Sequence, residues 1–310
     1  MTDPVLPVLQ TVRDWLRFAV SRFTAAQLVY GHGTATALDE AAFLILATLH
    51  LPHDQLEPWL DARLTMPERQ KLAEAIETRV VTRKPAAYIV KCAWIGPHKF
   101  YVDDRVIVPR SFLAELMIGG LDGVWTGDAP PARVLDLCTG SGCLAIIAAH
   151  MFPDATVDAA DLSTDALAVA KRNVAEHALS GRITLHEGDL FGAIGASRYD
   201  LIVCNPPYVT SVAVAAFPTE YKSEPAMAHD GGADGMVLVR RVLAEAAHHL
   251  TADGVLVVEI GQGRATIERA SPDLPFLWLD TEASEGEVFA LPASALAAAK
   301  PAKAKARTKR

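Results

Sequence analysis

Segments with the pattern of buried strands alternate with helical segments between Pro131 and Leu291. Helical periodicity is clear in Asp165 to His177 and in Val237 to Leu250. This alternation requires a parallel sheet with helices on both faces, so the sequence predicts an α/β fold with a mostly parallel seven-stranded sheet. The last two runs should add a hairpin-like edge. The expected strands are 133–138, 156–160, 183–187, 199–204, 254–260, 277–280 and 286–291.

The chain before this region has a different pattern. Apolar residues recur at helical spacing from residue 11 to about 83, and Pro67 stands where the first turn of a helix accepts proline. Short extended runs broken by Gly96-Pro97 follow and are typical of a hairpin. We therefore expect four parts: a helical substrate-recognition domain (1–90), a hairpin linker (91–111), the α/β domain (112–298) and a basic disordered tail (299–310).

Charge is distributed unevenly along the chain. The net charge is −8, although the tail carries six basic residues and no acidic one, so the rest of the chain is more acidic still. An acidic body argues against general capture of nucleic acid and suits a basic protein partner. The tail is interpreted as a solubilising extension, with an rRNA or ribosome tether as the alternative.

Other features narrow the class of protein. The sequence has no apolar run long enough to cross a membrane and no signal-peptide pattern, so we expect a cytoplasmic protein. The cysteines lie in or beside apolar runs, which indicates reduced thiols. The histidines lack a matching ligand cluster, so no metal site is expected. These residues are Cys92, Cys138, Cys143 and Cys204, and His50, His53, His248 and His249.

The expected strand ends carry the first functional signal, because ligands of such sheets bind there. Strand 133–138 runs into a glycine-containing loop that precedes a helix. The pattern Gly140-x-Gly142-x-x-Ala145 also fits a dinucleotide site, and Asp161 could bind a ribose hydroxyl in either case. An NAD(P)-dependent oxidoreductase is therefore an alternative at this point.

Two further carboxylates favour a cationic adenosine cofactor over a phosphorylated one. Asp136 lies before the glycines, where it would discourage a pyrophosphate and could hold an ammonium group. Asp189 ends the third strand and suits an adenine amino group. The combination resembles the class I methyltransferases, which have a Rossmann-like fold and use S-adenosyl-L-methionine. Cys138 stands where many members have glycine, and we interpret it as a small buried residue.

The fourth strand ends in Asn205-Pro206-Pro207-Tyr208. The prolines remove two backbone donors and hold the turn extended, so the Asn205 side-chain oxygen and the Pro206 carbonyl become two acceptors for a planar NH2 group. Tyr208 would pack over that flat group. Enzymes that methylate adenine, cytosine, guanine or glutamine share this motif, so a nucleic-acid amino methyltransferase is a second alternative. A non-enzymatic factor that binds ribosomal precursors is a third.

Segments around these motifs resemble the protein-(glutamine-N(5)) methyltransferases over nearly the whole chain. The segments are Lys99 to Ser111, Asp136 to Cys143, Asn205 to Tyr208, Glu220 to Pro225 and Asp234 to Met236. The release-factor branch has Pro-Arg-Pro in its linker. Val108-Pro-Arg-Ser111 is similar instead to the branch that acts on the third large-subunit ribosomal protein.

The resemblance implies site residues. Asn205, Pro206 and Tyr208 would be catalytic. The cofactor would contact Asp136, Cys138, Thr139, Gly140, Ser141, Gly142, Asp161, Asp189, Leu190 and Asn205, and the substrate would contact Asn205, Pro206, Pro207, Tyr208, Pro109 and Arg110. For Arg110, a structural salt bridge is an equal alternative.

Overall fold

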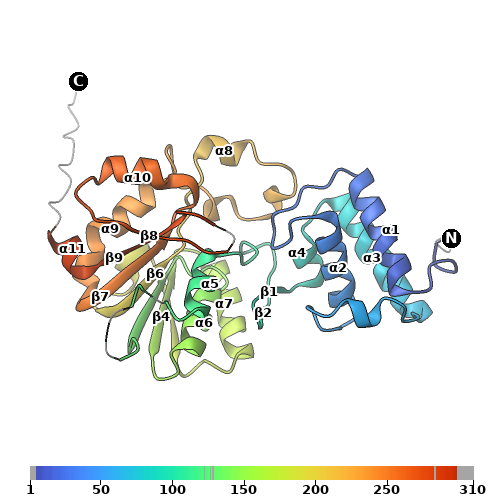
Figure 1. The fold of residues 1–310 in the computed structure, drawn as a ribbon, viewed down its shortest axis with the longest axis horizontal. Coiled ribbons are helices and arrows are strands. Elements are labelled where there is room, and N and C mark those ends of the chain that lie inside the picture. Colours follow the sequence, from blue (N-terminus) through green and yellow to red (C-terminus); the bar gives the residue numbers. More distant parts are fainter. Residues whose placement is uncertain (1–4, 122, 126, 128, 283, 299–310) are drawn as a thin grey trace. The chain divides into compact units, whose positions relative to one another are not determined.

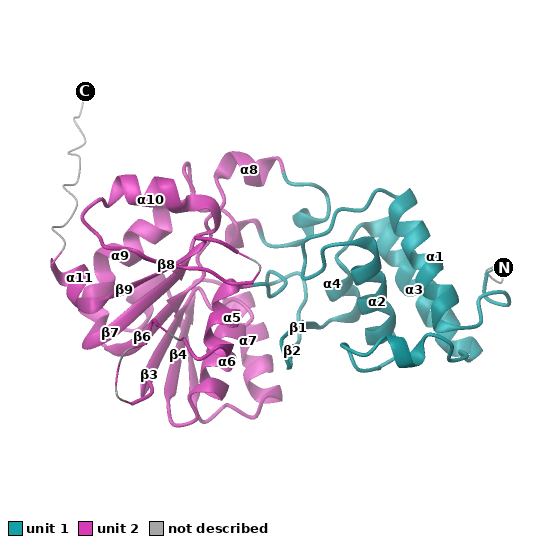
Figure 2. Ribbon diagram, viewed as in Figure 1, with its two compact units in different colours: residues 1–110, 217–225 teal, residues 111–216, 226–310 magenta. Residues whose placement is uncertain are grey.

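The computed structural model describes residues 5–121, 123–125, 127, 129–282 and 284–298, grouped in two compact units (Figure 1, Figure 2). Unit 1 contains the described residues up to Arg110 together with 217–225. Unit 2 contains 111–216 and the described residues from Ala226 on. The predicted basic tail, 299–310, lies outside the described residues. In the part of the chain described, no helix is long and apolar enough to cross a membrane.

Unit 1 is mainly helical. Its helices begin where the sequence offers caps: Thr11 and Asp14 form a capping box, as do Thr65 and Glu68, and Pro67 lies in the first turn as predicted. Trp15 and Phe23 are fully buried in the core of this unit. Its elements are α1 (Val12–Ala25), α2 (Ala37–Thr48), η1 (Glu57–Trp59), α3 (Met66–Thr82), α4 (Ala86–Val90), the antiparallel strands β1 (Ala93–Ile95) and β2 (His98–Phe100), and η3 (Tyr221–Ser223).

Unit 2 is built on a seven-stranded sheet in the order β5-β4-β3-β6-β7-β9-β8. The first five strands in this order are parallel, and β9 runs antiparallel to both of its neighbours. The α/β prediction and its hairpin-like edge are confirmed. The strands are β3 (Arg133–Leu137), β4 (Thr156–Asp161), β5 (Ile183–Glu187), β6 (Tyr199–Cys204), β7 (Leu250–Glu259), β8 (Leu277–Leu279) and β9 (Val288–Pro292).

Most strand boundaries lie within two residues of their predictions, and the start of β7 differs most. Leu250 has a helical pattern but is the first residue of β7, where it pairs with Tyr199 of β6. The register between these strands shifts before Leu201, and this irregularity lets the strand start directly after the helix. Periodicity could not show the shift, because it depends on the partner strand.

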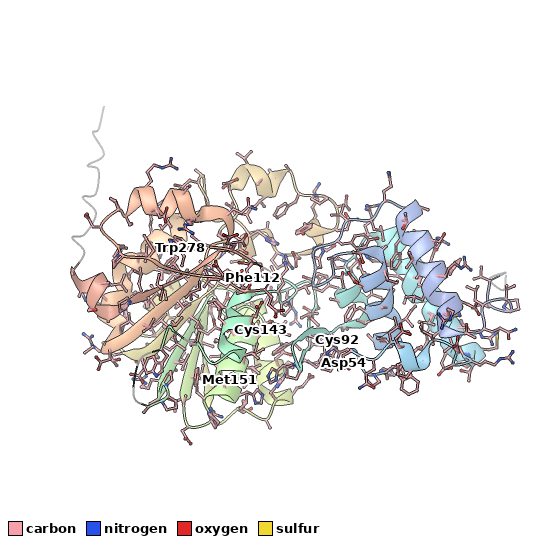
Figure 3. All side chains as sticks on the ribbon, in the orientation of Figure 1. Asp54, Cys92, Phe112, Cys143, Met151 and Trp278 are labelled. Atoms are coloured by element: carbon pink, nitrogen blue, oxygen red, sulfur yellow. The ribbon has the colours of Figure 1, made fainter. Side chains whose placement is uncertain are left out.

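Helices cover both faces of the sheet. Because strand order runs outward in opposite directions from β3 and β6, right-handed crossovers place α6 and α7 on one face and α9 on the other (Figure 1). Helix α6 runs from Cys143 to Met151 (Figure 3), and seven of its nine residues are buried. The helices are α5 (Phe112–Ile118), α6, α7 (Thr164–Glu176), η2 (Leu190–Ala193), α8 (Ser211–Ala215), η4 (Ala226–Ala228), α9 (Val237–His249), η5 (Gly261–Gly263), α10 (Arg264–Ala270) and α11 (Ala293–Ala298).

Candidate functional site

The carboxyl ends of β3 and β6 lie side by side, and strand order reverses between them. Leu137 of β3 is in register with Cys204 of β6, so the glycine loop after β3 and the asparagine turn after β6 leave the sheet as neighbours. Ligands bind at such a point in parallel sheets. The structure therefore brings together the two motifs that the sequence singled out.

The glycine loop needs unusual backbone angles. Cys138, Gly140 and Gly142 have φ values of 59°, 55° and 81°. A side chain at Gly142 would come within 3.1 Å of the Ala170 side chain, whereas a Cβ at Gly140 would meet no described atom within 4 Å. Gly142 is thus needed for close packing, while Gly140 leaves space above the loop for a ligand.

Asp136 supports this loop from below. It is fully buried, and its Oδ2 accepts hydrogen bonds from the Thr139 hydroxyl at 2.5 Å and the Ala145 amide at 3.0 Å. Its Oδ1 is buried without a partner among the described residues. Burial raises the pKa of Asp136 to about 7. An unpaired buried carboxylate oxygen is costly, so it marks a place for an external donor such as an ammonium group.

Asp161, at the end of β4, holds the loop from the side. Its Oδ2 accepts from the Gly140 amide at 2.8 Å, and its Oδ1 accepts from the Ser163 amide at 2.9 Å. Burial raises the pKa of this carboxyl. Each carboxylate oxygen has two lone pairs, so both can still accept from a ribose hydroxyl. Asn173 of α7 completes the support by donating to the Ser141 carbonyl at 2.8 Å.

Asp189 differs from the other two strand-end acids. About half of its side chain is exposed, and it pairs with Arg241 of α9 at 2.8 Å. The next residue, Leu190, is buried and has a φ of 49°. This carboxylate is therefore engaged at the surface, unlike Asp136.

The asparagine turn presents its amide. The Asn205 side chain is half-buried and makes no hydrogen bond to the described residues, whereas Pro206 is buried. The Tyr208 hydroxyl donates to Glu259 Oε1 at 3.1 Å. An amide without an internal partner at the end of a buried strand is available to a ligand.

Three glycines that the sequence prediction did not name as site residues pack behind this turn. A Cβ at Gly231 would lie 2.6 Å from the Pro207 carbonyl oxygen, and one at Gly261 would lie 2.7 Å from the Tyr208 ring. A Cβ at Gly235 would collide with the Tyr208 carbonyl oxygen. Gly235 and Gly261 also have positive φ values of 75° and 51°. The signals in the sequence were the glycine-rich run Asp230 to Gly235 and the family segment Asp234 to Met236, and neither includes Gly261.

Pro109 and Arg110, predicted at the substrate entrance, belong to unit 1. Pro109 is buried, and Arg110 forms a two-pronged ion pair with Glu224 through hydrogen bonds of 2.7 Å each. The Glu224 side chain is fully buried and also accepts from the Val108 amide. The structural salt bridge considered for Arg110 is thus present.

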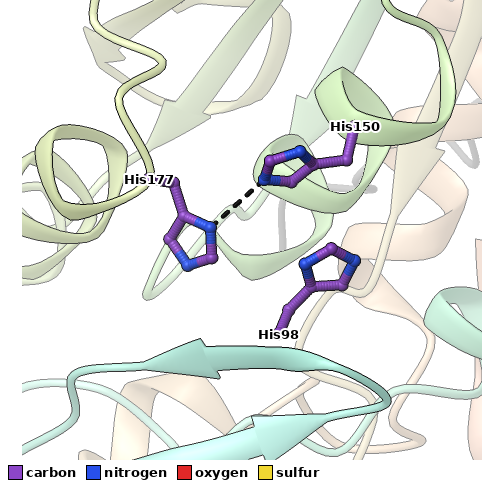
Figure 4. A group of neighbouring side chains, drawn as sticks. All are labelled: His98, His150 and His177. Atoms are coloured by element: carbon purple, nitrogen blue, oxygen red, sulfur yellow. Dashed lines mark hydrogen bonds between the residues drawn. The ribbon is translucent and has the colours of Figure 1, made fainter.

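Two histidines of unit 2 lie close together. His150 Nε2 of α6 and His177 Nδ1, which follows α7, are 3.2 Å apart and share a hydrogen bond (Figure 4). His98, also drawn there, belongs to unit 1. Two imidazoles are fewer than the three or four protein ligands of zinc sites, so this pair alone does not make one.

Comparison with known proteins places the chain in a family. The family model "Methyltransferase small domain" matches residues 126–219. The ribosomal protein uL3 glutamine methyltransferase of Bradyrhizobium diazoefficiens is 53% identical over 294 residues, which cover 93% of this chain and 92% of that protein. The Bordetella pertussis protein of the same name is 55% identical over 284 residues, covering 91% and 95%.

A third relative extends the match. The ribosomal protein uL3 glutamine methyltransferase of Burkholderia pseudomallei is 53% identical over 305 residues, which cover 96% of this chain and 99% of that protein. Such identity over nearly the whole length includes both compact units, and it confirms the predicted resemblance to the ribosomal-protein branch. The chain belongs to the ribosomal protein uL3 glutamine methyltransferase family.

Proposed function

We propose that this methyltransferase transfers a methyl group from S-adenosyl-L-methionine to the side-chain amide nitrogen of a glutamine in ribosomal protein uL3. The observation that carries the proposal is the unpaired Asn205 amide beside a glycine loop with an unpaired buried carboxylate. The Asn205 amide suits a planar NH2 group, and the unpaired carboxylate oxygen of Asp136 suits an ammonium group.

The residues of the loop fit the cofactor. Asp136 Oδ1 would accept from the amino group of the methionine moiety, and Asp161 would accept from the ribose hydroxyls. The space above Gly140 admits the ligand next to the backbone. Cys138, Thr139, Ser141 and Gly142 belong to the same loop and would contact the cofactor, and Asp189 and Leu190 would lie beside its adenine. When bound, the cofactor supplies an electrophilic methyl group on a sulfonium.

The turn activates a weak nucleophile. The lone pair of a carboxamide nitrogen is delocalised, so the nitrogen reacts only when it is oriented and its planarity is relaxed. Asn205 Oδ1 and the Pro206 carbonyl accept its two N–H bonds and aim the nitrogen, while Pro207 keeps the turn rigid and Tyr208 packs over the amide. Orientation of this kind can lower a barrier by about 7 to 11 kcal/mol in well-placed systems.

Proton balance requires no strong base. The nitrogen gains a bond to the methyl carbon as the carbon–sulfur bond breaks, and the cationic nitrogen is then acidic enough to lose its proton to water. None of the proposed site residues is a histidine, which agrees with this scheme. The turn needs to supply acceptors only.

The choice of uL3 as the substrate rests on the names of the similar proteins. Three proteins with this substrate in their names match over nine-tenths of the chain or more. A release factor and a nucleic-acid amino group are the alternatives for the same turn. A ribosomal substrate would place the enzyme in the cytoplasm, and we assign its recognition to unit 1, with Pro109 and Arg110 shaping the entrance.

A substrate competition tests the proposal. Purified chain is incubated with labelled S-adenosyl-L-methionine and equal amounts of uL3, a release factor and an rRNA fragment. We expect label on uL3, and fragmentation mass spectrometry should locate the added methyl on a glutamine side chain. Preferential transfer to the release factor or to RNA would overturn the assignment.

A further inference from the structure

Glu259, at the carboxyl end of β7, is a buried acid with no role in the mechanism above. It is fully buried, and burial raises the pKa of its carboxyl. Neighbouring residues of the strand, such as Val257 and Val258, are apolar and equally buried. A carboxylate at such a position is costly unless its hydrogen bonds serve a purpose.

The carboxylate joins two segments that are far apart in sequence. Glu259 Oε1 accepts the hydroxyl of Tyr208 at 3.1 Å. Glu259 Oε2 accepts the hydroxyl of Ser111 at 2.6 Å and the amide of Phe112 at 2.9 Å. Each oxygen therefore faces a different partner: one holds the substrate turn, and the other holds the start of α5.

The Tyr208 ring is restricted at a second place by the same strand end. Gly261 follows Glu259 by two residues, and a Cβ there would lie 2.7 Å from the ring. The ring thus rests against bare backbone while its hydroxyl is held by the carboxylate. Both contacts come from 259–261, so this short segment sets the direction of the ring.

We propose that Glu259 is the positioning residue of the substrate turn, holding Tyr208 so that its ring packs over the glutamine amide. This inference rests on the proposed function, since it assumes that Tyr208 contacts the substrate. Glu259 acts only through Tyr208. Its second oxygen is held by Ser111 and Phe112, so the carboxylate keeps its position when the Tyr208 ring moves.

The test is a double-mutant cycle of Glu259→Gln and Tyr208→Phe. Glutamine keeps the size of the side chain and one acceptor for α5, but presents an NH2 group to the tyrosine hydroxyl. Each single variant should lower kcat for uL3 methylation on the order of 10- to 100-fold, the value of a hydrogen bond to a charged group. The double variant should lose no more than the worse single variant, because both changes remove the same hydrogen bond. Cofactor affinity should stay within about twofold.

Asp200 provides the matched control. It is a half-buried carboxylate at the opposite end of the same sheet, and like Glu259 it accepts from both backbone amides and a hydroxyl: the amides of Ala132 and Arg133 and the hydroxyl of Thr251. Asp200→Asn should lower thermal stability yet keep kcat within about twofold. A purely structural role for Glu259 predicts equal kcat losses in the two variants and would overturn the inference.

The remaining outcomes are also decisive. Losses that multiply in the double variant mean that Glu259 does not act through Tyr208. If Glu259→Gln does not fold, Ser111→Ala takes its place in the double-mutant cycle, because Ser111 donates to Glu259. The losses of kcat in Ser111→Ala and Tyr208→Phe should then also be non-additive. If wild-type protein does not methylate uL3, the proposed function fails; if wild type is active and the cycle is additive, only the role of Glu259 fails.

Discussion

The glycine loop after β3 and the asparagine turn after β6 leave neighbouring strands, yet they are held in different ways. The loop is held by side chains below and beside it: Asp136 and Asp161 accept its hydroxyl and amide hydrogens. The turn is held from behind by close contact with backbone at Gly231, Gly235 and Gly261. The buried carboxylate of Asp136 and the half-buried carboxylate of Asp161 shape the loop, whereas the absence of side chains at three glycines shapes the turn.

This difference predicts different sensitivities. A loop that depends on carboxylates should respond to changes of charge and pH, and the effect should appear in cofactor binding. A turn that depends on tight packing should respond to added volume, and the effect should appear in turnover. The variants below test this difference between the loop and the turn, beginning with the largest expected effect.

Asn205→Ala should reduce turnover on the order of 100- to 1,000-fold, because it removes an acceptor whose hydrogen bond strengthens as the substrate nitrogen becomes cationic. Cofactor affinity should change far less, since the loop is supported by Asp136 and Asp161 instead. Single-turnover methylation of uL3 and calorimetric titration with the cofactor measure the two quantities. Near-normal turnover in the alanine variant would refute the role given to the turn.

Asn205→Asp sharpens this test, because it keeps an acceptor and adds a negative charge near the sulfonium. More activity than in the alanine variant is expected if the residue acts only as an acceptor. Equal inactivity with normal cofactor binding would show that the neutral amide itself is required.

Asp161→Ala should weaken cofactor binding by about 1.5 to 3 kcal/mol, the scale of a hydrogen bond to a charged group. It removes the acceptor of the Gly140 amide as well as the proposed ribose contact. Asp189→Ala is the matched comparison, because its carboxylate is half-exposed and paired with Arg241, so its proposed contact with the adenine amino group should contribute only about 0 to 1 kcal/mol to affinity. Equal losses of affinity in the two variants would contradict the distinction between buried and surface acids.

Much of this architecture was predictable from the sequence, because strand and helix periodicity depend on local pattern. The five parallel strands, the edge pair and the positions of both motifs follow from it. The contacts that hold the asparagine turn in place could not be predicted. Glu259 contacts residues 208 and 111, and Gly261 contacts the Tyr208 ring, so both roles depend on the folded arrangement rather than on neighbours in sequence.

The segment 217–225 shows the same limit. It lies between two stretches of unit 2 but belongs to unit 1, where Glu220 accepts the Val29 amide and Glu224 binds Arg110. The sequence showed only that part of this segment resembles the family, and it gave no physical role for the residues. In the structure, its role is to supply two buried carboxylates, Glu220 and Glu224. Burial of charged residues cannot be inferred from a single sequence.

Gly261→Ala should destabilise the turn by about 1 to 3 kcal/mol, because it combines a positive φ with a Cβ 2.7 Å from the Tyr208 ring. Turnover should fall while cofactor affinity is retained. Gly181→Ala is the control, since a Cβ there meets no described atom within 4 Å. Urea unfolding and kinetic assays of both variants make the comparison, and equal behaviour would mean that packing behind the turn is loose.

The last expected effect concerns Asp136 and pH. Burial raises the pKa of Asp136 to about 7, well above its ordinary value, so at intermediate pH the folded protein holds a proton that the unfolded chain has lost. The contribution of this group to stability is therefore complete below about pH 4 and is lost as pH rises through about 7. Asp136→Asn can still accept from Thr139 and Ala145 through its amide oxygen, but it cannot titrate.

The free energy of unfolding of wild type should thus decline relative to Asp136→Asn between about pH 4 and about pH 7. Cofactor binding should show the opposite trend, because an ammonium group beside Oδ1 favours the ionised carboxylate. Wild-type affinity should strengthen as pH rises through about 7, and the asparagine variant should lack this dependence. Urea titrations and calorimetry at both ends of the range measure the two slopes. Parallel pH profiles for the two proteins would show that Asp136 is already ionised without the cofactor, and that the loop, like the turn, is held mainly by its packing.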